Sequence, residues 1–204
     1  MERPYNPLEK QHLGESLVRA LLARPCRPLP PGASFPGAGV YVLYYHGDFG
    51  PYGPVSRANQ RDKCSAPIYV GHARLSGARK GIEADPELGQ ESLFGRLSEH
   101  AESISAVKNL ALEHFTCRYL VVDELWVTLA ERLLIESYQP LWNRVIDGFG
   151  IHTPGKGRKK QKRSAWDVLH PGRPFVKRLR LLPGKYTAEE LIAEIKQHFK
   201  DRDG

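Results

Sequence analysis

Residues 39–45 have the sequence Gly-Val-Tyr-Val-Leu-Tyr-Tyr, and this run of β-branched and aromatic residues predicts a strand over 40–45. Similar runs follow at 67–73 and 115–122, so three strands are expected. Glycine, proline and basic residues punctuate the segment 47–65, which predicts a long loop. We expect the first two strands to pair as a hairpin whose tip this loop enlarges.

Two stretches with a helical periodicity of apolar residues lie after the hairpin. The first spans 92–109, and within it Arg96 and His100 are four residues apart, so they share a second face of that helix. The second spans 126–138 and is expected to end near Pro140, because the residue before a proline avoids helical geometry. These stretches predict the two central helices.

Both ends of the chain carry a helix signal. At the N-terminus, Asn6 is a candidate N-cap, Pro7 suits the first helical position, and Glu9 is placed to return a capping bond. Near the C-terminus, Thr187 and Glu190 have the spacing of a capping box ahead of an amphipathic stretch. An apolar stripe of this kind more often packs against a core or an interface than performs chemistry.

The chain has 204 residues and a formal net charge of +7, with a pI of about 9.4. This length suits a single domain, 1–204. Within it, 1–38 forms an N-terminal helix and linker, 39–146 a core, and 147–204 an irregular basic loop and a C-terminal helix. A basic balance favours a polyanionic partner such as nucleic acid, although lysine and arginine also serve solubility.

The three cysteines, Cys26, Cys64 and Cys117, are odd in number, and no two of them have metal-ligand spacing. Three reduced thiols in a cytoplasmic protein are therefore predicted. No apolar run approaches membrane-spanning length, and the N-terminus lacks the apolar core of a signal peptide. A cytoplasmic location without membrane contact is expected.

Four separated stretches carry a pattern that relates the chain to a known family. They are Gly39-Val40-Tyr41, Ile68-Tyr69-Val70-Gly71, Arg96-x-x-x-His100, and Glu131-x-x-Leu134-Ile135 leading to Pro140-x-x-Asn143. In this order they resemble the GIY-YIG nuclease superfamily. The resemblance implies an α/β (α+β) fold with a small central, mostly antiparallel three-stranded sheet flanked by helices.

The same resemblance implies roles for the matching residues in the hydrolysis of a phosphodiester. Tyr41 takes a proton from the attacking water and His100 relieves Tyr41 of its own, since a phenol with a pKa near 10 is a poor base alone. Tyr69 orients the phosphate or the water, and which tyrosine is the base stays open. Arg96 binds the phosphate with its planar charged fork, and Asn143 holds the site together through side-chain hydrogen bonds.

Glu131 is the candidate metal ligand. Ala130, Leu133 and Leu134 surround it, so its carboxylate lies near the edge of a buried face and needs a partner such as a cation. Mg²⁺ suits this position because it often takes one or two carboxylates and keeps several waters, with Mn²⁺ as a substitute. The alternative is a solvated glutamate on a helix surface, just as the alternative for Arg96 is a surface salt bridge.

One position departs from the family pattern. Many members carry a lysine directly after the glycine of the second motif, where this chain has His72. A neutral imidazole cannot replace a permanent charge. Either His72 is protonated on DNA or the cation comes from elsewhere, such as Arg74 or Lys80. His72 is counted among the DNA-binding candidates for this reason.

Further segments resemble the small type II restriction endonucleases of this superfamily: 47–65, 142–143, 147–155 and 166–172. The resemblance implies Mg²⁺-dependent cleavage of double-stranded DNA at a short palindrome by a homodimer, with CCGCGG as the expected site. It also implies a companion DNA methyltransferase in a prokaryotic host, although not as a stable partner.

The best candidate for a DNA-contacting arm holds six basic residues in eight: Lys156, Arg158, Lys159, Lys160, Lys162 and Arg163. Phosphate contacts there give affinity without sequence choice, whereas arginines read guanine through O6 and N7. The candidates for base reading are Arg57, Arg61, Arg144 and Arg173. The alternative for the basic run is a solvated tail segment.

Two other functions fit parts of the pattern. A structure-specific or repair nickase has the same core but usually carries further domains. A non-catalytic, basic DNA-binding protein accounts for the charge, yet binding alone does not require a carboxylate such as Glu131 that repels phosphate. A cleavage assay with and without Mg²⁺ separates the three.

Overall fold

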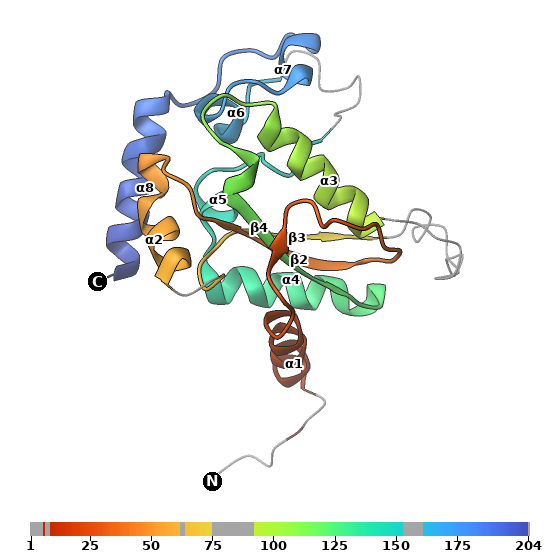
Figure 1. Ribbon diagram of the computed structural model, residues 1–204. Helices are drawn as coiled ribbons and strands as arrows, with labels where there is room; N and C mark the ends of the chain where they lie inside the picture. The colour runs from red at the N-terminus through yellow and green to blue at the C-terminus, as the bar shows by residue number, and fades with distance from the viewer. Residues whose placement is uncertain (1–5, 7–8, 62–63, 75–91, 153–160, 204) are drawn as a thin grey trace.

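A four-stranded antiparallel sheet lies at the centre of the computed structural model (Figure 1). Its strands are β1 (Arg27–Pro28), β2 (Gly39–Tyr45), β3 (Pro67–Ala73) and β4 (Phe115–Val121), and their order across the sheet is β1-β4-β2-β3. The predicted hairpin of β2 and β3 is confirmed, and β1 adds one strand that is too short to leave a sequence pattern. The structure describes residues 6, 9–61, 64–74, 92–152 and 161–203.

Strand β2 is buried along its whole length because helices cover both of its faces. Its side chains alternate between two hydrophobic cores, as the pleat of a strand requires. Tyr41 and Leu43 belong to one core, and Val40 and Val42 belong to the other. The unbroken apolar run at 39–45 is the consequence of this double coverage.

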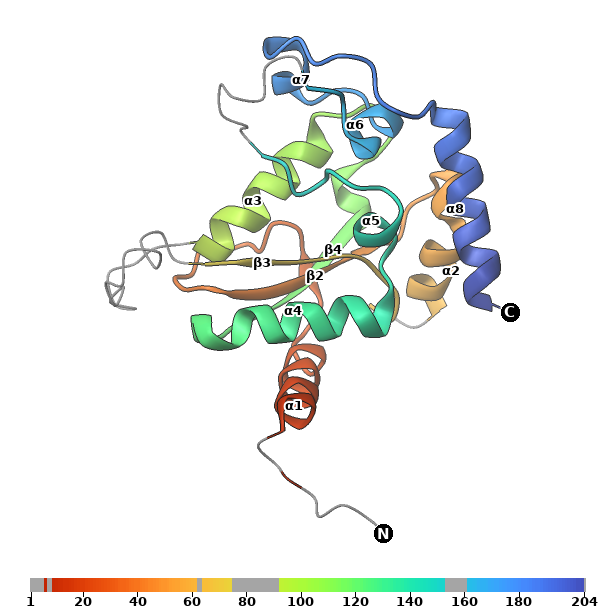
Figure 2. The same cartoon turned by 180° about the vertical axis from the view of Figure 1, so that it is seen from behind.

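The helices lie in two layers, which Figures 1 and 2 show from opposite sides. On the Val40 face lie α1 (Lys10–Leu22) and α4 (Glu124–Tyr138). On the Tyr41 face lie α2 (Gly53–Arg61), α3 (Ser92–Ser105), α5 (Leu141–Arg144), α6 (Ala165–Leu169) and α8 (Ala188–Asp203). The short elements η1 (Gly50–Tyr52), η4 (Leu112–His114) and α7 (Pro174–Arg178) complete the described part of the chain.

The prediction of a loop over 47–65 is wrong, because η1 and α2 occupy most of it. Pro54 stands in the first turn of α2, where a missing N–H breaks no helical bond. Asn59 on α2 is fully buried, and its side-chain amide donates to the carbonyls of Tyr45 and Ala66 while its oxygen accepts from the Ala66 N–H. The insertion is therefore held against both strands at the end of the hairpin where Tyr44 pairs with Pro67.

The terminal helices differ in how well their caps were predicted. The N-terminal helix begins at Lys10 with Glu9 as its N-cap, so the predicted cap at Asn6 is wrong; Pro7 lies outside the described residues. The predicted capping box of α8 is confirmed: the Glu190 N–H donates to Thr187 Oγ1 at 3.2 Å, and the Thr187 N–H donates to Glu190 Oε2 at 2.8 Å.

The central helices begin and end a few residues away from their predicted bounds. Helix α3 ends at Ser105 instead of Asn109. Helix α4 begins at Glu124, ahead of the apolar stripe, because the Asp123 side chain accepts the N–H of Leu125 and caps the first turn. The segment after α5, predicted to be irregular, contains the short helices α6 and α7.

The expectation of three free thiols is wrong for two of them. Cys26 and Cys64 form a disulfide with their Cα atoms 6.5 Å apart, and Cys117 is free and buried. The two cysteines are 38 positions apart and give no sequence signal for this pairing, because folding of the hairpin and its insertion brings them together. None of the described helices is long and apolar enough to cross a membrane.

Candidate active site

A buried hydrogen bond between Tyr41 on β2 and His100 on α3 lies at the centre of the candidate site. The Tyr41 hydroxyl and His100 Nε2 are 2.5 Å apart, and both side chains are shielded from solvent. Burial, reinforced by Tyr69 nearby, raises the pKa of Tyr41 well above its usual value. Burial also lowers the pKa of His100 well below its usual value, with further lowering from His152 and Arg96. Both groups are therefore neutral at rest.

Tyr69 on the neighbouring strand contacts this pair. Its ring centroid lies 6.2 Å from that of Tyr41 and 5.3 Å from that of His100. Burial and the charge of Glu131 raise its pKa to about 12. Gly71 stands opposite Tyr41 in the sheet, and a Cβ there would overlap the Tyr41 ring, so a glycine is needed for the tyrosine to lie across β3.

Arg96 lies one helical turn before His100 on α3. Its guanidinium donates to the Glu99 carboxylate at 2.8 Å, and its side chain is 37% exposed. An ion pair this exposed contributes little to stability, so the guanidinium is free to exchange its partner for a phosphate. Its charge also lowers the pKa of His100 and counters the rise at Tyr41, which places it within electrostatic reach of the buried pair.

Glu131 and His72 meet on the other side of β3. His72 Nδ1 lies 2.7 Å from Glu131 Oε2, and the Glu131 side chain is 22% exposed. Arg74, directly after β3, donates to Thr128 Oγ1 on α4. His72, the residue that departs from the family pattern, therefore contacts the candidate metal ligand Glu131 directly. Lys80 lies outside the described residues.

Asn143 fixes the free edge of the sheet. Its side-chain oxygen accepts the N–H of Val70 and its amide donates to the carbonyl of Val70, both at 2.8 Å. The two bonds imitate a neighbouring strand, so β3 is held at the position that carries Tyr69 and His72. Asn143 makes this contact from α5, whose N-cap is Pro140.

A segment that sequence reasoning missed, 147–152, covers the buried pair. Phe149 stacks on His100 with ring centroids 4.4 Å apart and an interplanar angle of 15°. His152 approaches the same imidazole edge-to-face, with centroids 4.5 Å apart. Neither residue belongs to a helix or strand, so no periodicity marked it. Their glycine-flanked position in 147–155 was part of the family resemblance, but without assigned roles.

Arg173 holds this covering segment in place. Its guanidinium donates twice to the Asp167 carboxylate, at 2.8 Å each, and also to the carbonyls of Gly148, Phe149 and Ile151. The side chain is 2% exposed. The hypothesis that Arg173 reads bases is therefore wrong, because all three guanidinium nitrogens donate hydrogen bonds to groups inside the protein.

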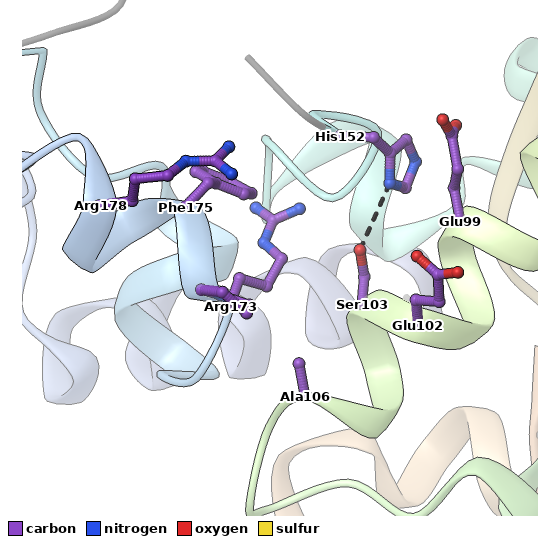
Figure 3. Close-up of a pocket in the computed structure, with 9 residues that line it drawn as sticks. Glu99, Glu102, Ser103, Ala106, His152, Arg173, Phe175 and Arg178 are labelled. Atoms are coloured by element: carbon purple, nitrogen blue, oxygen red, sulfur yellow. Dashed lines mark hydrogen bonds between the residues drawn. The ribbon is translucent and has the colours of Figure 1, made fainter.

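A cavity of about 240 Å³ adjoins His152 (Figure 3). Glu99, Glu102 and Ser103 of α3 line one side, and Arg173 and Arg178 line the other. His152 Nδ1 lies 3.3 Å from Ser103 Oγ. Burial, with the charges of Arg96 and Arg173, lowers the pKa of His152 to about 3, so this imidazole is neutral as well.

The remaining DNA-contact candidates are not part of this cluster. Arg57 and Arg61 are exposed on α2. This helix lies at one end of the hairpin, and the pair Gly39–Ala73 lies at the other end. Arg144, Lys162 and Arg163 are exposed too. The other members of the basic run, Lys156, Arg158, Lys159 and Lys160, lie outside the described residues.

The site thus joins a buried phenol–imidazole pair to an arginine and a carboxylate, all carried by a small antiparallel sheet and its two covering helices. A family model described as the Eco29kI GIY-YIG domain matches residues 33–199, which is more than half of the chain. No curated protein shows a significant match. The sheet, the order of the motifs and this match agree, and the chain belongs to the GIY-YIG family of restriction endonucleases that the Eco29kI domain represents.

Proposed function

We infer that this restriction endonuclease hydrolyses double-stranded DNA in a Mg²⁺-dependent reaction at a short palindrome. The observation that carries the inference is the buried hydrogen bond between Tyr41 and His100, with Arg96 and Glu131 close enough to influence its tyrosine. A base, a phosphate-binding cation and a metal-binding carboxylate are the groups that phosphodiester hydrolysis needs.

The two neutral groups at the centre suggest how the attacking water is activated. Because burial raises the pKa of Tyr41, a free phenolate is not the resting form. Tyr41 instead gives its proton to His100 Nε2 as it accepts one from the water, so the phenol remains neutral throughout. Tyr69, 6.2 Å away between ring centroids, is placed to orient the water or the phosphate.

Glu131 is the residue that fits a metal. Among the described residues, no group of three or more His, Cys, Asp or Glu side chains lies close enough to hold an ion, so the protein offers a single carboxylate. Mg²⁺ accepts such a site because it keeps its waters and takes substrate phosphate oxygens, and Mn²⁺ has similar preferences. When bound, the metal neutralises phosphate charge and assists the leaving oxygen. His72 Nδ1 contacts and orients the carboxylate.

Target and assembly follow from the family and from the number of sites. The motif set occurs once in the chain, and one such site cuts one strand. Cleavage of both strands of a palindrome then requires two subunits related by a two-fold axis. We therefore propose a homodimer, CCGCGG as the site, and a host methyltransferase that protects the same sequence.

The test is plasmid digestion with Mg²⁺ or with a chelator, followed by mapping of the cut ends. Discrete fragments whose ends all map to CCGCGG sites are expected. Glu131→Gln should abolish cutting while DNA binding persists, because the change removes a charge that repels phosphate. Glu136→Gln, an exposed position on the same helix, is the matched control and should cut normally. Near-normal cutting by Glu131→Gln in Mg²⁺ would exclude the metal assignment.

The same digestion tests the assembly. A homodimer should linearise supercoiled plasmid with little nicked circle accumulating, and ultracentrifugation with a cognate duplex should show two chains per duplex. A monomer on DNA that releases nicked plasmid as its main intermediate would favour a nickase, and binding without cutting would favour a non-catalytic DNA-binding protein.

A further inference from the structure

The proton that His100 takes from Tyr41 has no exit in the proposed reaction. His100 is completely buried, and its second ring nitrogen, Nδ1, has no hydrogen-bond partner among the described residues. The charges of Arg96 and Arg173 act on it, and both oppose a positive imidazole. A proton that stays on His100 therefore leaves an unpaired buried charge, which is costly. A turnover needs a route that carries it away.

His152 is the polar group next to His100 that leads toward solvent. The two imidazole centroids are 4.5 Å apart with the rings at 68°, so the side chains are in van der Waals contact. His152 Nε2 is buried and, within the described part of the chain, also lacks a partner. The opposite nitrogen, Nδ1, reaches Ser103 Oγ at the wall of the 240 Å³ cavity (Figure 3). The two unpartnered nitrogens, His100 Nδ1 and His152 Nε2, thus belong to imidazole rings that are in contact.

We propose that His152 relays the proton from His100 to the cavity beside Ser103, an inference that rests on the proposed nuclease reaction. His152 acts through His100, so it is a positioning residue and does not contact the substrate. Arg173 sets its place, because the bonds to the carbonyls of Phe149 and Ile151 fix the segment that carries it.

The transfer leaves each participating side chain neutral, and the released charge leaves as a proton in the cavity water. At rest, His100 and His152 each carry a proton on Nδ1. As water attacks phosphorus, it gives a proton to Tyr41 Oη. The Tyr41 O–H proton then moves to His100 Nε2, and the His100 Nδ1 proton moves to His152 Nε2. The His152 Nδ1 proton passes to Ser103 Oγ, whose own proton enters cavity water. Both histidines end as the opposite tautomer. After product release the reverse path restores them: cavity water returns a proton through Ser103, and Tyr41 gives one to the water that refills the emptied site.

The charges around the cavity favour this outlet. Glu99 and Glu102 of α3 line it and attract a released proton, while Arg178 on α7 lies across from them. The buried end of the path faces Tyr41, Tyr69 and Arg96, none of which supplies a free acceptor for the His100 Nδ1 proton. The path thus runs from the buried His100, where a positive charge is costly, to the cavity lined by Glu99 and Glu102, where a proton is stabilised.

The experiment measures single-turnover cleavage of plasmid by the wild type, His152→Phe and His152→Ala. The phenyl ring keeps the packing on His100 but cannot carry a proton, and we expect cleavage to slow by about 10²-fold, the low end of the contribution of acid–base groups. His152→Ala opens the space toward the cavity, so added imidazole should restore much of its rate. Imidazole should not restore His152→Phe, and melting temperatures identify any loss due to misfolding.

A second readout does not depend on cutting. Nitrogen-15 spectra of the imidazoles should show the Nδ1–H tautomer at His100, and His152→Phe should shift the His100 Nδ1 resonance. Wild-type cleavage rates in His152→Phe, or no effect of imidazole on a folded His152→Ala, would overturn the relay. If the wild-type protein itself does not cut DNA, the proposed function fails; an unshifted His100 Nδ1 signal would instead refute the contact on which the relay depends.

Discussion

Replacement of Arg173 by methionine should destabilise the protein severely. The change keeps most of the side-chain volume but leaves the Asp167 carboxylate, itself 2% exposed, without its cation. Removing one partner of a buried ion pair typically costs about 3–5 kcal/mol. The carbonyls of Gly148, Phe149 and Ile151 lose a donor as well, so the loss should lie at the upper end of that range.

Urea and thermal unfolding measure this effect. For a chain of this size, about 3–5 kcal/mol corresponds to a fall in melting temperature of roughly 6–20 °C. Lys177→Ala removes a positive charge from an exposed position on the neighbouring helix α7, and it should stay within about 0.5 kcal/mol of the wild type. The double variant Asp167→Leu/Arg173→Met should recover part of the loss, because no unpaired charge remains.

The result that would refute this reasoning is a stable Arg173→Met protein with altered sequence preference. Such a protein would mean that the guanidinium leaves its internal partners to read bases. Unchanged stability with unchanged cleavage would instead mean that the segment 147–152 does not depend on Arg173.

Three further predictions concern the Tyr41–His100 pair, the buried His170 and the lysines of the basic run. Tyr41→Phe and His100→Ala should each slow cleavage by roughly 10²–10⁴-fold, and the double variant should be scarcely slower than either, since the two act as one unit; additive losses would separate them. Burial lowers the pKa of His170 from its usual 6.5 to about 3. Between these two pH values, the His170 imidazole therefore binds a proton in the unfolded state but not in the folded state. Stability should therefore drop toward acid, by roughly 1.4 kcal/mol per pH unit from this residue, and the slope should lessen in His170→Gln. Replacing the lysines of 159–162 with alanine should flatten the salt dependence of DNA binding by about 0.9 per lost phosphate contact; an unchanged slope with lost specificity would place them at base edges.

The sheet and its covering helices could be predicted because their signals are local. The strand 67–73 has the predicted bounds, and the hairpin follows from two adjacent strand runs. β1 could not be predicted, since two residues carry no periodicity and their pairing with β4 is set by tertiary contacts. The disulfide between Cys26 and Cys64 was missed for the same reason, as it depends on contacts between distant segments.

The insertion 47–65 shows where local signals mislead. Its glycines and prolines indicated a break, but Gly53 and Pro54 stand at the start of α2, where proline is tolerated. What holds the helix is Asn59, whose buried amide and carbonyl pair with backbone groups of Tyr45 and Ala66, beside the two strands of the hairpin. An asparagine inside a predicted loop gives no hint of this, because its partners lie 7 and 14 residues away.

The candidate site was reached by a different route from the fold. Spacing alone placed Arg96 and His100 on one helical face, but only the family resemblance connected them to Tyr41. The structure adds what neither source contained, namely that Phe149 and His152 cover His100. These residues come from an irregular segment whose position depends on a buried arginine, and such a contact is a property of the whole fold.

The contact between Arg173 and the covering segment links the stability of the fold to the protonation of the Tyr41–His100 pair. The Tyr41–His100 pair is neutral because it is buried, and on this side it is buried because Phe149 stacks on it. Phe149 in turn stays in place through the bond from Arg173 to its carbonyl. A residue that touches no substrate therefore sets the protonation of the groups proposed to activate water. Loosening the covering segment should admit water to His100, bring its pKa back toward the usual value, and weaken the proton transfer even where the fold survives.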